Sequence, residues 1–183
     1  RCRIVVAEGP FPAYNSQLMS DGWNDILLIK PSSLGDIVMT LPALSALRRS
    51  FPAARITWLV RPAFAPLIEG HPHLDEIVYF DRKTLGKAWY HPGAMKVLVE
   101  LIADLRHRRF DAVLDLQSLL RTALLAWLSG CPQRFGPVWG REFAHHFYTT
   151  TVPRRIEWVH VIDYYMKLVE AMELRPGQRR EDV

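Results

Sequence analysis

The segment Lys30–Asp36 (KPSSLGD) places two serines, a glycine and a carboxylate between a short apolar run and an amphipathic stretch. Backbone amides at such a junction, together with the start of a helix, favour anionic or partly negative groups. The segment is neither a GxGxxG fingerprint nor a P-loop. Ser33 and Asp36 also have the S-x-x-D spacing of a capping box, with Gly35 permitting a tight turn. The residues alone therefore allow a binding role and a purely structural one.

A second candidate lies in the segment Asp81–Trp89 (DRKTLGKAW), which carries Arg82, Lys83 and Lys87 within six residues. Charge runs usually face water, so a solvated surface loop is one interpretation. Anion binding is the other, since the planar fork of arginine suits phosphates and carboxylates.

Gln117 and Arg121 directly follow a short apolar run, Asp111–Leu116, and are a third candidate group. Gln117 could equally lie beside a helix cap, and Arg121 could extend its stem along an apolar helix. Asp115 is expected to cap that helix. We assign no catalytic role to the two aspartates of the run.

These segments must be positioned by strands and helices that alternate along the chain. Apolar runs rich in β-branched residues predict strands at 26–29, 55–60, 76–80 and 111–116, and weaker patterns suggest strands at 133–136 and 147–152. Helical spacing predicts helices at 36–51, 63–69, 95–109, 118–128 and 157–174. Pro42 lies inside the first helix and should kink or restart it.

Short buried strands separated by helices predict an α/β fold, with a Rossmann-like, mostly parallel sheet covered by helices on both faces. In such sheets ligands bind at the carboxyl ends of the strands. The loops after residues 29, 60, 80 and 116 should therefore gather at one functional edge.

Composition excludes several other classes. The 183 residues are 49% hydrophobic and 23% charged, as in ordinary globular proteins. The net charge of +4 permits acidic partners, but the cations are scattered and no nucleic-acid-binding motif is present. The apolar runs are too short for a membrane span. Two cysteines, Cys2 and Cys131, cannot form a disulfide framework, and the seven histidines lack metal-ligand spacing.

Three stretches together resemble a known family: KPSSLGDIVMTLPAL, ALRRSFPAARITWLV and DAVLDLQSLLRTALLAWL. They are similar to the amino-terminal domain of glycosyltransferase family 9, the lipopolysaccharide heptosyltransferases, from about Asp25 to about Leu174. The resemblance implies the amino-terminal half of a GT-B enzyme, in which two Rossmann-like domains face a cleft. We expect an N-terminal extension at 1–24, with a possible misplaced start, an acceptor-side domain at 25–174, and the start of an interdomain linker at 175–183. The donor domain would be absent.

The resemblance also implies roles for individual residues. Asp36 matches the carboxylate proposed as general base on the acceptor hydroxyl, while Ser32, Ser33 and Gly35 match the loop that positions it. Acceptor binding would involve the following residues, of which Arg141 lies in WGREFAHHFY: Arg82, Lys83, Lys87, Gln117, Arg121 and Arg141.

The implied reaction is an inverting, metal-independent transfer of heptose from ADP-heptose to the lipid A inner core. It needs no cofactor besides this nucleotide-sugar substrate. We expect a cytoplasmic protein, peripheral at the inner membrane, that contacts the anionic membrane surface and no nucleic acid. A different sugar donor or acceptor in surface-glycan assembly, or a non-catalytic glycolipid-binding module, are alternatives.

Overall fold

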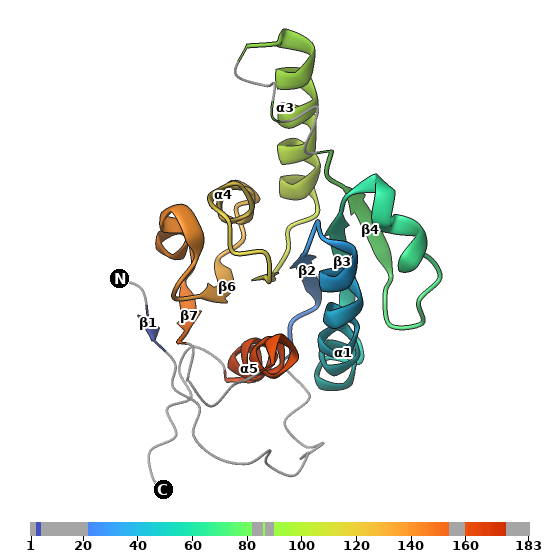
Figure 1. Cartoon of the computed structure of the whole chain (residues 1–183), viewed down its shortest axis with the longest axis vertical. Coiled ribbons are helices and arrows are strands. Elements are labelled where there is room, and N and C mark those ends of the chain that lie inside the picture. Colours follow the sequence, from blue (N-terminus) through green and yellow to red (C-terminus); the bar gives the residue numbers. More distant parts are fainter. Residues whose placement is uncertain (1–2, 5–21, 82–85, 87–89, 154–159, 175–183) are drawn as a thin grey trace, which may run out of the picture.

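The computed structural model describes residues 3–4, 22–81, 86, 90–153 and 160–174, and its centre is a parallel sheet. The strand order is β1-β7-β6-β5-β2-β3-β4, and every neighbouring pair is parallel (Figure 1). The strands are β1 (Arg3–Ile4), β2 (Asp25–Ile29), β3 (Arg55–Val60), β4 (Glu76–Tyr79), β5 (Ala112–Asp115), β6 (Gln133–Pro137) and β7 (Thr150–Val152). The predicted α/β fold with a parallel sheet is confirmed.

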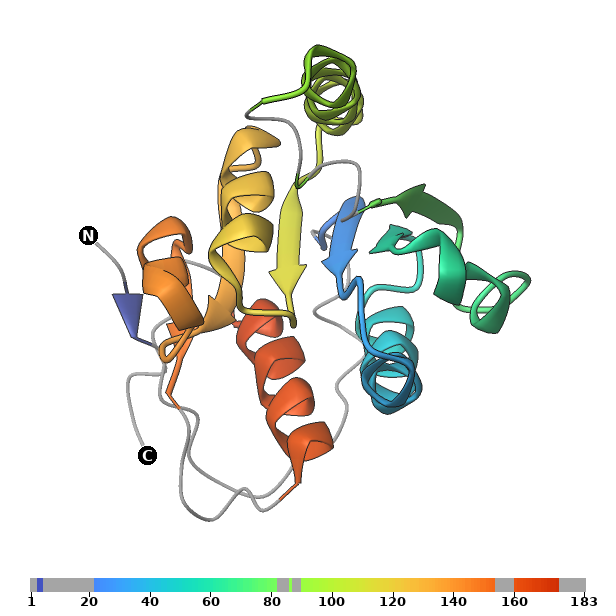
Figure 2. The ribbon, with the colours of Figure 1, turned by 45° about the horizontal axis from the view of Figure 1, so that its top comes forward.

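Strand order shows where such a sheet binds ligands. From β2 the chain first adds β3 and β4 on one side, and it then returns to add β5, β6 and β7 on the other. The direction of growth therefore reverses between β2 and β5, which lie side by side with Ile29 level with Asp115 (Figure 2). Open α/β sheets bind ligands in the crevice beyond the carboxyl ends of the strands at this switch point.

Helices cover both faces of the sheet because the central strands are apolar on both sides. Ile26 and Leu28 pack in the cluster that includes α1 and α5, while Leu27 and Ile29 pack in the cluster that includes α3 and α4. Figure 1 shows the two pairs of helices on opposite sides of the sheet. The helices are α1 (Leu34–Ser50), α3 (Pro92–His107), α4 (Leu120–Leu128) and α5 (Val161–Glu173), with short 3-10 turns η2 (Pro62–Leu67) and η3 (Arg141–Phe147). None of the helices in the described segments is long and apolar enough to cross a membrane.

Of the two expectations for Pro42, a restart of the first helix is wrong, because α1 continues through it from Leu34 to Ser50, while a kink stays a prediction. Pro42 has no N–H to donate to the carbonyl of Val38, four residues earlier in the helix. Pro42 is exposed, and Val38 is 51% exposed. The missing hydrogen bond therefore lies on the solvent side of α1, where water can replace it.

Two further elements differ from the sequence prediction. Phe147 belongs to η3, so β7 is shorter than the strand expected at 147–152. Arg3 and Ile4, within the expected N-terminal extension, pair with β7 and add a two-residue strand to its edge. The predicted helix at 157–174 is described only from residue 160, and it begins at Val161.

Candidate functional site

The loops after β2 and β5 meet at the switch point of the sheet and form the candidate site. Lys30 follows β2, and its Nζ donates a hydrogen bond of 3.1 Å to the carbonyl oxygen of Leu116, which follows β5. A side chain thus joins two loops that are 86 residues apart in the sequence. The ends of β2 and β5 can be followed in Figure 2.

Asp36 lies in the first turn of α1, three residues after the N-cap Ser33. Its Oδ2 accepts hydrogen bonds from the backbone N–H of Ser33 (2.9 Å) and from the Ser33 hydroxyl (3.1 Å). The Nζ of Lys30 is 3.8 Å from the same oxygen. Among the described residues, no hydrogen bond or ion pair uses Oδ1, and the side chain is 38% exposed. The carboxylate therefore caps the helix with one oxygen and presents the other.

Sequence analysis gave Lys30 no role of its own, although it begins the first candidate segment. It is only 4% exposed, and its Nζ lies 5.4 Å from the centre of the Tyr165 ring on α5. Burial lowers the pKa of the Lys30 amine, while the negative charges of Asp36 and Asp115 act in the opposite direction. The amine is thus held in a pocket of loop, ring and carboxylate groups.

Asp115 fixes the loop after β5 from inside the protein. Its Oδ1 accepts hydrogen bonds from the backbone N–H groups of Gln117 (2.8 Å) and Ser118 (3.1 Å). Its Oδ2 accepts a 2.8 Å hydrogen bond from the Tyr148 hydroxyl. Burial raises the pKa of the Asp115 carboxyl, although these hydrogen bonds favour the ionised form. The expected helix cap is wrong, because Asp115 closes the turn that precedes α4, which begins at Leu120.

The serines and the glycine of the first loop lie at the exposed start of α1. Ser33 and Gly35 are exposed and Ser32 is half-buried. The expectation that Gly35 serves a tight turn is wrong, because it lies in the first turn of α1 and lacks a positive φ. Apart from its chain neighbours and the backbone of its own helix, no described atom lies within 4 Å of the position that a Cβ would occupy there, so the space beside this residue is open.

Of the predicted acceptor residues, three lie in the described part of the chain, and all three follow carboxyl ends of strands. Gln117 is half-buried, and its Oε1 is buried without a hydrogen-bond partner among the described residues. Arg141 begins η3, and its backbone N–H donates to the Ser118 carbonyl (2.9 Å), which brings η3 beside the β5 loop. Arg121 lies half-buried in the first turn of α4. Arg82, Lys83 and Lys87 lie outside the described residues.

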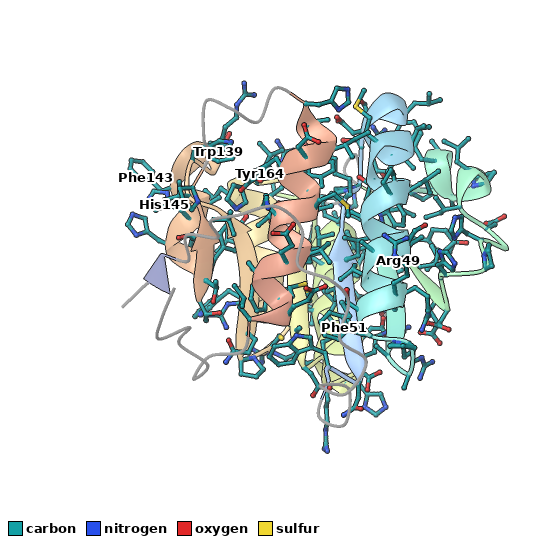
Figure 3. All side chains as sticks on the ribbon, turned by 90° about the horizontal axis from the view of Figure 1, so that it is seen from below. Arg49, Phe51, Trp139, Phe143, His145 and Tyr164 are labelled. Atoms are coloured by element: carbon teal, nitrogen blue, oxygen red, sulfur yellow. The ribbon has the colours of Figure 1, made fainter. Side chains whose placement is uncertain are left out.

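Aromatic side chains follow β6 at this edge of the sheet. The rings of Trp139 and Tyr164 are 4.3 Å apart, while Phe143 is 73% exposed (Figure 3). Glu142 and Phe143 adopt consecutive left-handed conformations with φ of 58° and 64°. Such backbone strain in residues other than glycine persists only where the surrounding structure enforces it.

Two hollows, of about 430 and 350 Å³, lie away from the candidate site. The smaller hollow is lined by residues at the starts of strands, including Asp25 and Arg55. Glu76 and Arg108 line both hollows. Glu76 pairs with both arginines. These ion pairs lie at the starts of β3 and β4, away from Asp36.

Comparison with known proteins relates this arrangement to one family. The model of glycosyltransferase family 9 (heptosyltransferase) matches residues 98–180. Lipopolysaccharide heptosyltransferase 1 of Escherichia coli K12 is 29% identical over 100 residues, which make up 55% of this chain and 31% of that protein. The lipopolysaccharide core heptosyltransferase OpsX of Haemophilus influenzae is 25% identical over 156 residues, or 84% of this chain and 42% of that protein.

Solved structures give the same result for the fold. The E. coli heptosyltransferase WaaC with ADP-2-deoxy-2-fluoro heptose superposes with a TM-score of 0.73 at 24% identity, over 87% of this chain and 50% of that one. A family 9 glycosyl transferase from Veillonella parvula superposes with a TM-score of 0.65 at 24% identity, over 88% of this chain and 45% of that one. The chain thus spans half or less of the length of these relatives. The family match over residues 98–180 and these relatives make the chain similar to glycosyltransferase family 9, the heptosyltransferase family.

Proposed function

We propose that the chain is the acceptor-side half of a heptosyltransferase that moves heptose from ADP-heptose to the lipid A inner core of lipopolysaccharide. Its E. coli relative is a lipopolysaccharide heptosyltransferase, and the similar WaaC structure holds an ADP-heptose analogue. The observation that carries the proposal is the Asp36 carboxylate, which is anchored through Oδ2 and open at Oδ1, at the switch point of the sheet.

In the proposed reaction Asp36 is the general base of an inverting transfer. The acceptor hydroxyl oxygen forms a bond to the anomeric carbon of heptose while its proton passes to Asp36 Oδ1. The bond between that carbon and the diphosphate oxygen breaks, and ADP leaves with the electron pair. We propose that the negative charge on the leaving diphosphate is stabilised by groups in the part of the relatives that this chain does not span. In this proposal no metal ion takes part.

The acceptor would be held by the polar groups that surround Asp36 at the carboxyl edge. Ser32, Ser33 and Gly35 would position the acceptor hydroxyl at the open start of α1. Cationic side chains suit the phosphates and carboxylates of an inner-core acceptor. We assign acceptor binding to Arg82, Lys83, Lys87, Gln117, Arg121 and Arg141.

The proposed acceptor also determines where the protein works. A lipid-anchored acceptor places the reaction at the cytoplasmic face of the inner membrane, with the protein attached peripherally. The net charge of +4 supports contact with an anionic surface.

The test of the base is Asp36→Asn in the full-length protein, with initial rates measured at saturating donor and acceptor. Asparagine is nearly isosteric and its oxygen can still accept from Ser33, so the melting temperature should change little. It cannot take a proton, so kcat should fall by about 10²–10⁴-fold.

The matched control is Asp111→Asn. Asp111 also accepts two hydrogen bonds through one carboxylate oxygen, here from the backbone N–H groups of Asn24 and Asp25, but it does so at the opposite edge of the sheet. The control should keep normal kcat. Near-normal kcat in Asp36→Asn would leave Asp36 as a helix cap only and would refute the proposed base.

A further inference from the structure

We propose that Lys30 is a positioning residue, whose buried ammonium group holds Oδ2 of Asp36 so that Oδ1 faces the acceptor hydroxyl. This inference rests on the role of Asp36 proposed above. It adds a residue that acts through the base and does not itself touch the substrate.

Burial of the Lys30 side chain is the first observation. Lysine is rarely buried, because removing an ammonium group from water is costly unless charges and hydrogen bonds compensate. Here the side chain is 6% exposed. The contacts of this enclosed side chain are with the protein, so we assign its effect to those neighbours.

Three separate elements hold the ammonium group in place. The Leu116 carbonyl of the β5 loop accepts its hydrogen bond at 3.1 Å. The Tyr165 ring of α5 lies 5.4 Å from Nζ, within the range of a cation–π interaction. Asp36 at the start of α1 supplies the nearest carboxylate, at 3.8 Å. Because three elements contact the amine, its position is fixed. A group that holds the Asp36 carboxylate in one orientation must itself be fixed in this way.

The second observation is that the donors around Asp36 all engage the same carboxylate oxygen. The described partners of the Asp36 carboxylate are the N–H and hydroxyl of Ser33 and the amine of Lys30, and all of them engage Oδ2. The two oxygens of a carboxylate are equivalent, so these donors fix the plane of the group: a partial rotation would take the engaged oxygen away from all of them, and the other oxygen stays free. The Ser33 groups belong to the exposed end of a helix, whereas Lys30 is anchored in the core. Lys30 therefore gives the base an orientation fixed to the sheet.

The experiment is a double-mutant cycle of Lys30→Met and Asp36→Asn in the full-length protein. Methionine is unbranched and similar in length but carries no charge. A misplaced reacting group can cost about 10²-fold in rate. Lys30→Met should therefore lower kcat by about 10²-fold, while the KM for the acceptor stays within about threefold because Lys30 does not touch the acceptor. In the Asp36→Asn background the same change should lower kcat by less than about threefold, since the group through which it acts is absent.

The matched control is Lys96→Met. Lys96 also lies 3.8 Å from a carboxylate oxygen, that of Glu100, but its side chain is 77% exposed. This variant should retain normal kcat in both backgrounds. Near-ultraviolet circular dichroism and the melting temperature establish that each variant is folded. If Lys30→Met does not fold, Lys30→Gln, which keeps a donor for the Leu116 carbonyl, takes its place in the cycle.

The outcomes separate the two proposals. Loss of activity in Asp36→Asn together with a non-additive effect of Lys30→Met supports both. If Asp36→Asn loses activity but Lys30→Met keeps normal kcat, or lowers kcat equally in both backgrounds, the positioning role is refuted and the base stands. Normal kcat in Asp36→Asn refutes the base itself and the inference that depends on it.

Discussion

Asp36 shows how one side chain can serve two roles that the sequence presents as alternatives. The S-x-x-D spacing predicts a cap, whereas the family resemblance implies a base. In the structure Oδ2 takes the capping hydrogen bonds from Ser33, and Oδ1 has no partner among the described residues. Capping thus fixes the carboxylate without using the oxygen that a base needs.

Gln117 provides a prediction in which stability and binding change in opposite directions. Its buried Oε1 lacks a partner in the described part of the chain, and an unpaired buried polar atom costs about 1–3 kcal/mol. Gln117→Met should leave the melting temperature unchanged or raise it. It should also raise the KM for the acceptor by up to about tenfold, the worth of one hydrogen bond.

Gln133→Met is the control for this prediction, because Gln133 is half-buried like Gln117 but begins β6 at the opposite edge of the sheet. It should not change the KM for the acceptor. A lower melting temperature with an unchanged KM in Gln117→Met would show that Gln117 is structural.

Asp115 predicts a pH dependence of stability. Because burial raises the pKa of this carboxyl above its unfolded value, the folded protein binds the proton more tightly than the unfolded chain does. Protonation then stabilises the fold: this contribution is full below the unfolded pKa and is lost as the pH rises through the folded pKa. The difference between the free energies of unfolding of the wild type and of Asp115→Asn should therefore increase in favour of the wild type as the pH falls from 7 toward 4. Urea unfolding of both proteins across this range measures the difference, and a constant or declining difference would contradict the prediction.

Lys30 illustrates why part of the site could not be read from the sequence. A lysine that ends an apolar strand is ordinarily expected to reach into solvent. Its burial depends on the Leu116 carbonyl and the Tyr165 ring, which are far away in the sequence and converge only through the fold. Asp36 was predicted because its motif is local, whereas the partners of Lys30 are not.

At the level of elements, prediction succeeded where one local pattern determines the structure. The apolar runs at 26–29 and 55–60 became β2 and β3 because their side chains are buried on both faces of the sheet. It failed at η3, where the chain passes through the left-handed conformations of Glu142 and Phe143. Neither residue type signals that conformation, so contacts with the rest of the fold must impose it.

Pro42 offers a prediction about helix α1. Since the helix continues through Pro42 on its exposed face, Pro42→Ala restores the hydrogen bond to the Val38 carbonyl and removes no buried contact. The free energy of unfolding should rise by about 1–3 kcal/mol.

Pro52→Ala is the control, because Pro52 lies just past the end of α1. Its loss should lower the free energy of unfolding by about 0.4–1 kcal/mol, since the unfolded chain gains conformational entropy. Urea unfolding measures both, and a destabilised Pro42→Ala would show that the proline is needed within the helix.

At the scale of the whole molecule, the two edges of the sheet differ in how completely their polar side chains are paired. At the amino edge Glu76 pairs with Arg55 and Arg108, and Arg108 also pairs with Asp104. At the carboxyl edge Asp36 Oδ1 and Gln117 Oε1 lack partners among the described residues. The sequence analysis predicted only that the loops after the strands gather at one edge, as they do in a parallel sheet; the function of that edge stays a prediction.

The last prediction concerns the 183-residue chain as an isolated unit. Its sheet is covered on both faces by helices with a continuous buried core, so we expect it to fold alone with one cooperative thermal transition. It spans about half of the WaaC chain, and the family resemblance assigns the donor pocket mostly to the other half. Because a base and an acceptor surface without that pocket cannot hold the sugar donor, the isolated chain should release no ADP from ADP-heptose in the presence of acceptor. Full-length protein with normal turnover is the positive control, measured by ADP release alongside thermal unfolding. Turnover by the isolated chain would show that it carries a donor site of its own.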